Sequence, residues 1–164
     1  MNVADKDALI ARLQPLLARI AALAPAERVD AAAVRELEAT LDAEWSPEGA
    51  EVRALGEAIA EGVAAGWLCD RGEPDARFSR VAKAGPQTHG LSIDVVRLRG
   101  AALQHTHPKG EVTLGFAVEG EPTFEDRAPG WVFLPPGSTH VPQTRGGVMD
   151  LIYFLPDGAV VWGG

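Results

Sequence analysis

Apolar residues in the first third of the chain recur at helical spacing. Leucines and isoleucines follow this spacing from about residue 5 to 24, and Pro15 inside the pattern indicates a kink or restart. A second helix is predicted after Asp30, a favourable N-cap, and Ser46-Pro47-Glu48 is typical of the start of a third helix that ends near Gly66. Each stripe is simply amphipathic, so we interpret these helices as a packing layer or dimerisation element.

The pattern changes from Phe78 onward to short β-prone runs separated by glycine and proline. Closely spaced short strands are typical of a sandwich or barrel, so the fold class is α+β. Residues 1–70 should form a helical segment of about three helices, and residues 71–164 an antiparallel β unit. The clearest strand candidates are Leu91–Arg99, Val112–Val118, Trp131–Leu134 and Val148–Leu155, with turns at Pro135-Pro136-Gly137 and Arg145-Gly146-Gly147.

Charge follows the same division of the chain. The formal net charge is −8, which disfavours nucleic acid and anionic lipid as partners. Residues 1–70 carry six basic and 13 acidic residues, a net −7, whereas residues 71–164 carry nine and ten, a net −1. All four histidines lie in this nearly neutral part.

Several classes of protein are disfavoured by the remaining composition. The single cysteine, Cys69, excludes an internal disulfide framework and a multi-cysteine metal site, and it agrees with a reducing compartment. The N-terminal residues show no signal-peptide pattern, and we expect no apolar run of the roughly 18 residues that a membrane span needs. The expectation is therefore a cytoplasmic protein with no membrane partner.

Candidate chemistry is concentrated between residues 104 and 140. In an extended strand, His105 and His107 present their imidazoles on one face, and Glu111 can close back on them after the turn at 108–110. His140 follows a strand and a tight turn that could return it from an adjacent strand. Three imidazoles and one carboxylate suit a divalent Fe, Mn, Zn, Ni or Co ion and leave positions open for water or substrate.

The order of these residues resembles the two motifs of the cupin superfamily, which are small jelly-roll-like β barrels with an interior metal. The segments HTHPKGEVTLGFAVEG, APGWVFLPPGSTHVPQTRGG and YFLPDGAV are similar, more narrowly, to the 4-hydroxylaminobenzoate lyase family. That resemblance implies conversion of 4-hydroxylaminobenzoate to 3,4-dihydroxybenzoate and ammonia, a carbon–nitrogen lyase step in nitroaromatic degradation. The metal would act there as a Lewis acid and a source of hydroxide.

A small aromatic carboxylate substrate would need a cationic partner in this acidic chain. Arg97 and Arg99 share one strand face before the metal motif, and substrate contact and solvated charge are both open for them. Solvated charge is favoured for Lys109. Tyr153, the only tyrosine, is a candidate acid or hydrogen-bond donor, with core packing as the alternative. His89 is a candidate proton shuttle, with an ordinary hydrogen-bonded histidine as the alternative.

Strand parity leads to an expectation about oligomeric state. If Glu111 points inward, Thr113, Gly115 and Ala117 follow it and leave room for an aromatic ring. The alternating residues of the strand then form an apolar outer stripe that must pack under the helices, a second sheet or a partner subunit; they are Val112, Leu114, Phe116 and Val118. We expect a homodimer.

Two other functions fit the same ligands. A cupin Fe(II) dioxygenase of a small aromatic or thiol substrate would use the open metal positions for O₂. A non-catalytic cupin would bind a small ligand or metal without product. Oxygen uptake separates the first from the lyase, and saturable binding without turnover separates the second.

Overall fold

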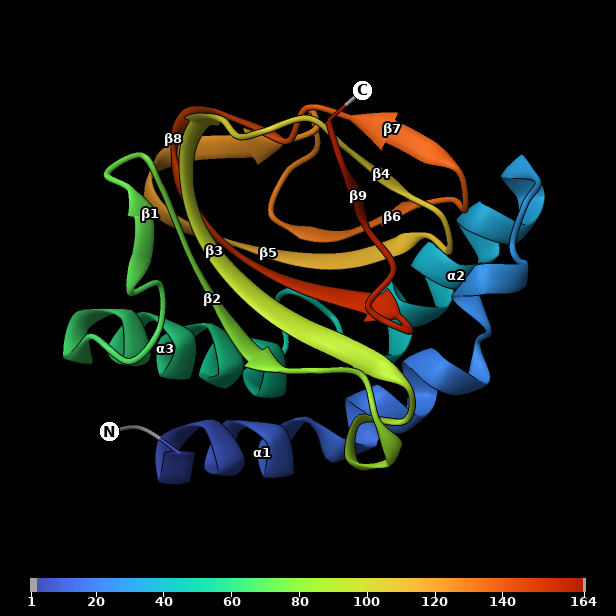
Figure 1. The fold of residues 1–164 in the computed structure, drawn as a ribbon, viewed down its shortest axis with the longest axis horizontal. Coiled ribbons are helices and arrows are strands. Elements are labelled where there is room, and N and C mark those ends of the chain that lie inside the picture. The colour runs from blue at the N-terminus through green and yellow to red at the C-terminus, as the bar shows by residue number, and fades with distance from the viewer. Residues whose placement is uncertain (1–2, 164) are drawn as a thin grey trace.

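A computed structural model describes residues 3–163 (Figure 1). Three helices come first: α1 (Val3–Ala22), α2 (Ala31–Glu44) and α3 (Ala50–Ala65), with a 3₁₀ turn η1 (Pro25–Glu27) after α1. A second 3₁₀ turn, η2 (Pro86–Thr88), lies among the strands. The strands are β1 (Arg71–Glu73), β2 (Ala76–Ala82), β3 (Leu91–Ala101), β4 (His105–His107), β5 (Glu111–Phe124), β6 (Gly130–Leu134), β7 (Ser138–His140), β8 (Gln143–Pro156) and β9 (Val161–Trp162).

The strands form two antiparallel sheets. One sheet has the order β1-β2-β3-β8-β5-β6, and the other has the order β7-β4-β9. The two sheets do not join into one closed barrel, and their arrangement is a jelly-roll-like sandwich with the N-terminal helices outside it (Figure 1). The expected α+β class is confirmed.

The outer face of the large sheet is covered by the helices. Val112 and Leu114 of β5 belong to the same buried cluster as Leu17 and Ile20 of α1 and Leu37 of α2. Helices therefore cover the outer stripe of β5 from Val112 to Phe116, which is one of the expected arrangements, whereas Val118 at its end is 36% exposed. The homodimer stays a prediction. Cys69 is buried in this cluster, where burial raises its pKa to about 12 and keeps the thiol protonated.

The predicted start of α2 at Asp30 and the predicted end of α3 at Gly66 are confirmed. Asp30 caps α2 by accepting a hydrogen bond from the Ala33 backbone N–H at 2.8 Å, and Gly66 ends α3 in the left-handed conformation. The predicted start of α3 at Ser46-Pro47-Glu48 is wrong, because Gly49 is its N-cap. Residues 46–49 instead form a turn, with a 2.9 Å bond from Gly49 N–H to Ser46 C=O.

The predicted turn at Arg145-Gly146-Gly147 is also wrong, because β8 runs through it. The pairing of β5 with β8 shifts register between Gly120 and Thr123, opposite these glycines. A Cβ on Gly147 would lie 1.9 Å from the Glu119 carbonyl oxygen, so glycine permits a close approach of two backbones rather than a chain reversal.

Helix α2 protects the exposed edge of the large sheet. β6 is an edge strand, and the Glu38 carboxylate of α2 accepts a 2.8 Å hydrogen bond from the Phe133 N–H. Trp131 of the same strand donates its indole N–H to the Trp45 carbonyl at 2.9 Å. These contacts fix α2 beside the strand that leads to the His140 turn.

One segment, Val3–Glu27, is long and apolar enough by length and composition to cross a membrane. The sequence expectation that no segment would pass this test is therefore wrong. Core helices and signal sequences pass it as well, and here the stripe from Leu9 to Ile20 is buried in the core. The absence of a membrane partner stays a prediction.

Replacement of Leu17 by Ala should destabilise the protein by about 2–5 kcal/mol, because the side chain is fully buried between helix and sheet. The matched control is Leu103→Ala, since Leu103 is 76% exposed and its loss should change stability by less than about 0.5 kcal/mol. Urea denaturation followed by circular dichroism measures both. Equal midpoints for the two variants would contradict the packing described for α1.

Candidate metal centre

Strand pairing brings the three motif histidines together. β4 pairs with β7 so that His105 lies directly opposite His140. The Pro135-Pro136-Gly137 turn sets this register, because the Gly137 N–H donates to the His107 carbonyl at 2.8 Å. The Gly110 N–H donates to the same carbonyl at 3.2 Å and closes the turn that leads to Glu111. The predicted turn at 135–137 is confirmed.

The four ligand atoms are spaced as around a single ion. His107 Nε2 lies 3.2 Å from Glu111 Oε2 and 3.2 Å from His140 Nε2, and His140 Nε2 lies 3.4 Å from Glu111 Oε2. With His105 included, one ligand atom per residue lies within 4.8 Å of every other. Bonds of about 2.1 Å to a common ion separate neighbouring ligand atoms by about 3.0–3.4 Å, so the set fits a divalent metal.

The hydrogen bonding around the cluster also fits a cation. Glu111 is fully buried, and neither of its carboxylate oxygens accepts a hydrogen bond from the described residues. A buried carboxylate without such partners is costly, and a metal ion would compensate its charge. His105 Nδ1 lies 3.0 Å from the Leu103 carbonyl, which fixes Nδ1 as the donor and leaves Nε2 as the ligand atom.

Glu125 is a member of the site that sequence reasoning missed. Its Oε1 lies 3.3 Å from His140 Nδ1 and accepts a 3.1 Å hydrogen bond from the Gln143 N–H. A carboxylate in this position orients a metal-binding imidazole and increases its basicity. Glu125 follows β5 in a left-handed conformation, and neither motif spacing nor periodicity marks it in the sequence.

The electrostatics favour the metal-binding protonation state at two of the ligands. Burial raises the pKa of Glu111, but contacts with His107 and His140 outweigh it and hold that pKa below its ordinary value. Burial and the neighbouring His107 lower the pKa of His105, which favours the neutral imidazole. Burial opposes protonation of His140, but Glu111 and Glu125 outweigh it and raise its pKa, so protons compete with metal there.

Tyr153 lies on the same face of the large sheet as Glu111. It pairs in register with Thr113, two residues beyond Glu111, and with Asp94 of β3. Burial, with the carboxylates of Glu111, Glu125 and Asp94, raises its pKa well above the ordinary value. The phenol therefore stays protonated and can act as a hydrogen-bond donor.

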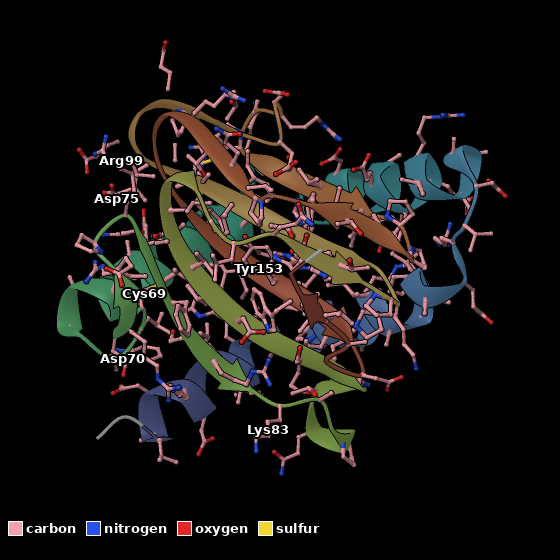
Figure 2. All side chains as sticks on the ribbon, turned by 45° about the horizontal axis from the view of Figure 1, so that its top comes forward. Cys69, Asp70, Asp75, Lys83, Arg99 and Tyr153 are labelled. Atoms are coloured by element: carbon pink, nitrogen blue, oxygen red, sulfur yellow. The ribbon has the colours of Figure 1, made fainter. Side chains whose placement is uncertain are left out.

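The two arginines are not brought to the ligands. Arg97 pairs in register with Asp150, which is on the helix-facing side of the sheet, and binds it through hydrogen bonds of 2.7 and 2.9 Å. Arg99 lines a surface hollow with Arg97 and Asp75, at one end of the sheet and away from Tyr153 (Figure 2). Parity places both side chains opposite to Glu111.

His89 and Lys109 also lie outside the ligand set. His89 is exposed and ends η2 in the left-handed conformation, with no described contact to the cluster. Lys109, in the turn between His107 and Glu111, forms an ion pair with Asp157. The favoured interpretation of Lys109 as a surface charge agrees with this partly exposed pair.

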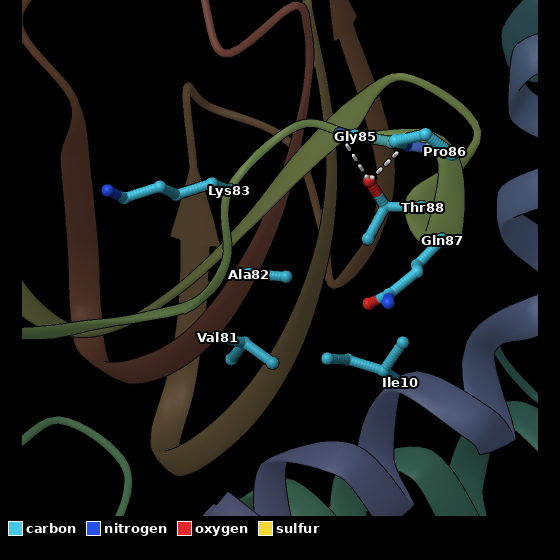
Figure 3. Close-up of a pocket in the computed structure, with 8 residues that line it drawn as sticks. All are labelled: Ile10, Val81, Ala82, Lys83, Gly85, Pro86, Gln87 and Thr88. Carbon is cyan, nitrogen blue, oxygen red and sulfur yellow. Dashed lines mark hydrogen bonds between the residues drawn. The ribbon is translucent and has the colours of Figure 1, made fainter.

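The hollow shown in Figure 3 lies elsewhere, between α1 and the η2 region, and contains none of the ligands. Thr88 occupies one wall, and its hydroxyl is already hydrogen-bonded to the Gly85 backbone.

On the ligand side of the large sheet, the space next to Gly115 is occupied, because a Cβ there would lie 2.6 Å from the Met149 terminal carbon. The expectation that this position leaves room for an aromatic ring is wrong.

A family model described as 4-hydroxylaminobenzoate lyase matches residues 18–162, which include all four ligands. The chain belongs to the 4-hydroxylaminobenzoate lyase family. Proteins of that name from Pseudomonas putida and Nocardioides sp. (strain LMS-CY) are similar to it. The first is 25% identical over 149 residues, covering 80% of this chain and 85% of the relative. The second is 27% identical over 135 residues, covering 76% and 80%.

Solved structures similar to this family member include cupin proteins. An RmlC-like cupin protein from Ralstonia eutropha JMP134 has a TM-score of 0.42 and 16% identity, over 56% of this chain and 62% of its own. The DMSP lyase DddQ from Ruegeria pomeroyi DSS-3 has a TM-score of 0.42 and 23% identity, over 66% of each chain.

His107→Ala should abolish stoichiometric binding of a divalent metal, because its Nε2 contacts both Glu111 and His140. The matched control is His89→Ala, which removes an exposed imidazole outside the cluster and should leave metal content unchanged. Elemental analysis of both proteins after identical metal loading measures the difference. Retention of one tightly bound ion by His107→Ala would contradict the assigned site.

Proposed function

We propose that this protein is a metal-dependent lyase that converts 4-hydroxylaminobenzoate to 3,4-dihydroxybenzoate and ammonia. The observation that carries the proposal is the family match over residues 18–162 together with the convergence of His105, His107, Glu111 and His140 within it. The bound ion is proposed to be Fe, Mn, Zn, Ni or Co, since nitrogen and carboxylate ligands accept all of them.

The reaction is balanced without an added oxidant. One water enters, and the N–O bond, the aryl C–N bond and one neighbouring ring C–H bond break. Two aryl C–O bonds form, at the ring carbons that carry the hydroxyls of the product, and the nitrogen leaves as ammonia with the released protons. When bound, the metal supplies Lewis acidity and lowers the pKa of coordinated water. His105, His107, Glu111 and His140 would hold that ion, and Glu111 would contribute a carboxylate whose pKa is already below its ordinary value.

Tyr153 is proposed to donate a hydrogen bond to the departing oxygen or nitrogen. Its phenol is protonated, lies on the ligand face, and has the Glu111 carboxylate close enough to affect its pKa. Neither Arg97 nor Arg99 is proposed to bind the substrate carboxylate, because both lie on the face of the large sheet opposite to Glu111.

The test of the function is anaerobic incubation of metal-loaded protein with 4-hydroxylaminobenzoate. We expect ammonia and 3,4-dihydroxybenzoate in equal amounts, with no product from His107→Ala under the same conditions. Quantitative chromatography and an ammonia assay measure the two products. Absence of product anaerobically, followed by O₂ uptake and product in air, would favour the dioxygenase. Saturable binding with no product in either atmosphere would favour a non-catalytic cupin.

Tyr153→Phe should lower kcat by roughly 10²-fold with little change in KM, because it removes a proton donor while its ring still packs against Phe124. Steady-state kinetics on protein of equal metal content measure this. A kcat equal to that of the wild type would assign Tyr153 to core packing instead.

A further inference from the structure

Trp162 has an unusual position for a tryptophan. It is 66% exposed, whereas Trp131 is buried and Trp45 and Trp67 are partly buried in the helix-side core. Trp162 lies in β9 and pairs in register with His105 of β4. The two rings meet edge to face, with centroids 5.0 Å apart. The most exposed indole of the protein therefore lies directly beside a metal ligand.

Backbone hydrogen bonds fix this segment against the ligand strands. The Gly163 N–H donates to the Gln104 carbonyl at 2.9 Å, and the Ala102 N–H donates to the Pro142 carbonyl at 2.9 Å. Leu103, whose carbonyl lies 3.0 Å from His105 Nδ1, and Val141, which follows His140 in the sequence, are also exposed, so we define Leu103, Val141 and Trp162 as the apolar rim. A large exposed apolar group held rigidly beside a polar site is typical of a ligand-binding surface.

Neighbouring Val161 faces the other way. It pairs with Thr106, whose hydroxyl lies 2.6 Å from the Thr139 hydroxyl on the side of the small sheet away from the imidazoles. Val161 is 56% exposed and belongs to the same two-residue strand as Trp162. The two residues thus differ mainly in which face of the sheet they occupy.

The interior of the sandwich offers an aromatic ring little room beyond the ligands. Phe124, Met149 and Leu151 form a second buried cluster there, and Met149 fills the space at Gly115. His140 is the least buried of the four ligands. A substrate ring whose substituent reaches the metal would therefore extend outward, towards His140 as the least buried ligand and towards the exposed Trp162 ring beside His105.

We propose that Trp162 is the aromatic wall of the substrate site and selects planar para-substituted benzoates by stacking on their ring. The inference rests on the proposed function and assigns the specificity-determining residue of the same site. An indole offers a large apolar surface and a π face that favours an aromatic ring over a saturated one of equal length and charge. Trp162 would contact the substrate ring, while the nitrogen substituent would reach the metal held by the four ligands.

The test compares two stable probes, 4-aminobenzoate and trans-4-aminocyclohexanecarboxylate, on metal-loaded full-length protein. Calorimetry on Trp162→Ala should show binding of 4-aminobenzoate weakened about 10-fold. Binding of the saturated probe should change by less than about 3-fold. Trp162→Phe should recover most of the affinity for the aromatic probe, and Val161→Ala should match the wild type for both probes.

Three results would overturn the inference. They are wild-type affinity of Trp162→Ala for 4-aminobenzoate, equal weakening of both probes, and loss of bound metal from Trp162→Ala. The last two would make Trp162 a support for His105 rather than a substrate contact.

Failure of the proposed lyase function can be distinguished from failure of the Trp162 assignment. A wild-type protein that releases no ammonia from 4-hydroxylaminobenzoate, yet binds 4-aminobenzoate in a Trp162-dependent way, would refute the lyase and keep the aromatic wall. Turnover with an unchanged KM in Trp162→Ala would refute the wall and keep the lyase.

Discussion

The Glu111 carboxylate is enclosed completely by protein and accepts no hydrogen bond from the described residues. An isolated buried charge of this kind is strongly unfavourable, so the surrounding structure must supply positive charge at this point. His107 and His140 come within 3.4 Å of the carboxylate, and the donor set fits a divalent ion. The small sheet meets this requirement, since its strands β4 and β7 carry the imidazoles.

Pairing of β4 with β7 is what converts separate sequence motifs into one site. A shift of one residue in this register would turn His140 to the outer face of the sheet, beside Thr106. The His107 carbonyl prevents that shift by accepting hydrogen bonds from both Gly110 and Gly137. Rigid backbone contacts, rather than the imidazoles themselves, therefore determine where the ligands meet.

The helical layer stabilises the large sheet and contributes none of the four ligand residues. It buries the outer face of the large sheet, and Glu38 of α2 satisfies the edge strand β6 immediately before the turn to His140. Most of the negative charge of the chain lies in residues 1–70. The ligand residues thus belong to the nearly neutral β portion of the chain.

Local and periodic features of the sequence were enough to predict the three helices, the main strands and the four residues that form the candidate metal centre. Asp30 acts within one helical turn, and His105 and His107 share a face because strands have a period of two. Non-local geometry was not accessible in this way. The side of the sheet on which Arg97 lies, the contact of Glu125 with His140, and the place of Trp162 beside His105 all depend on strand order and register. Those are decided only when distant segments pair, because no local preference encodes which strand becomes a neighbour.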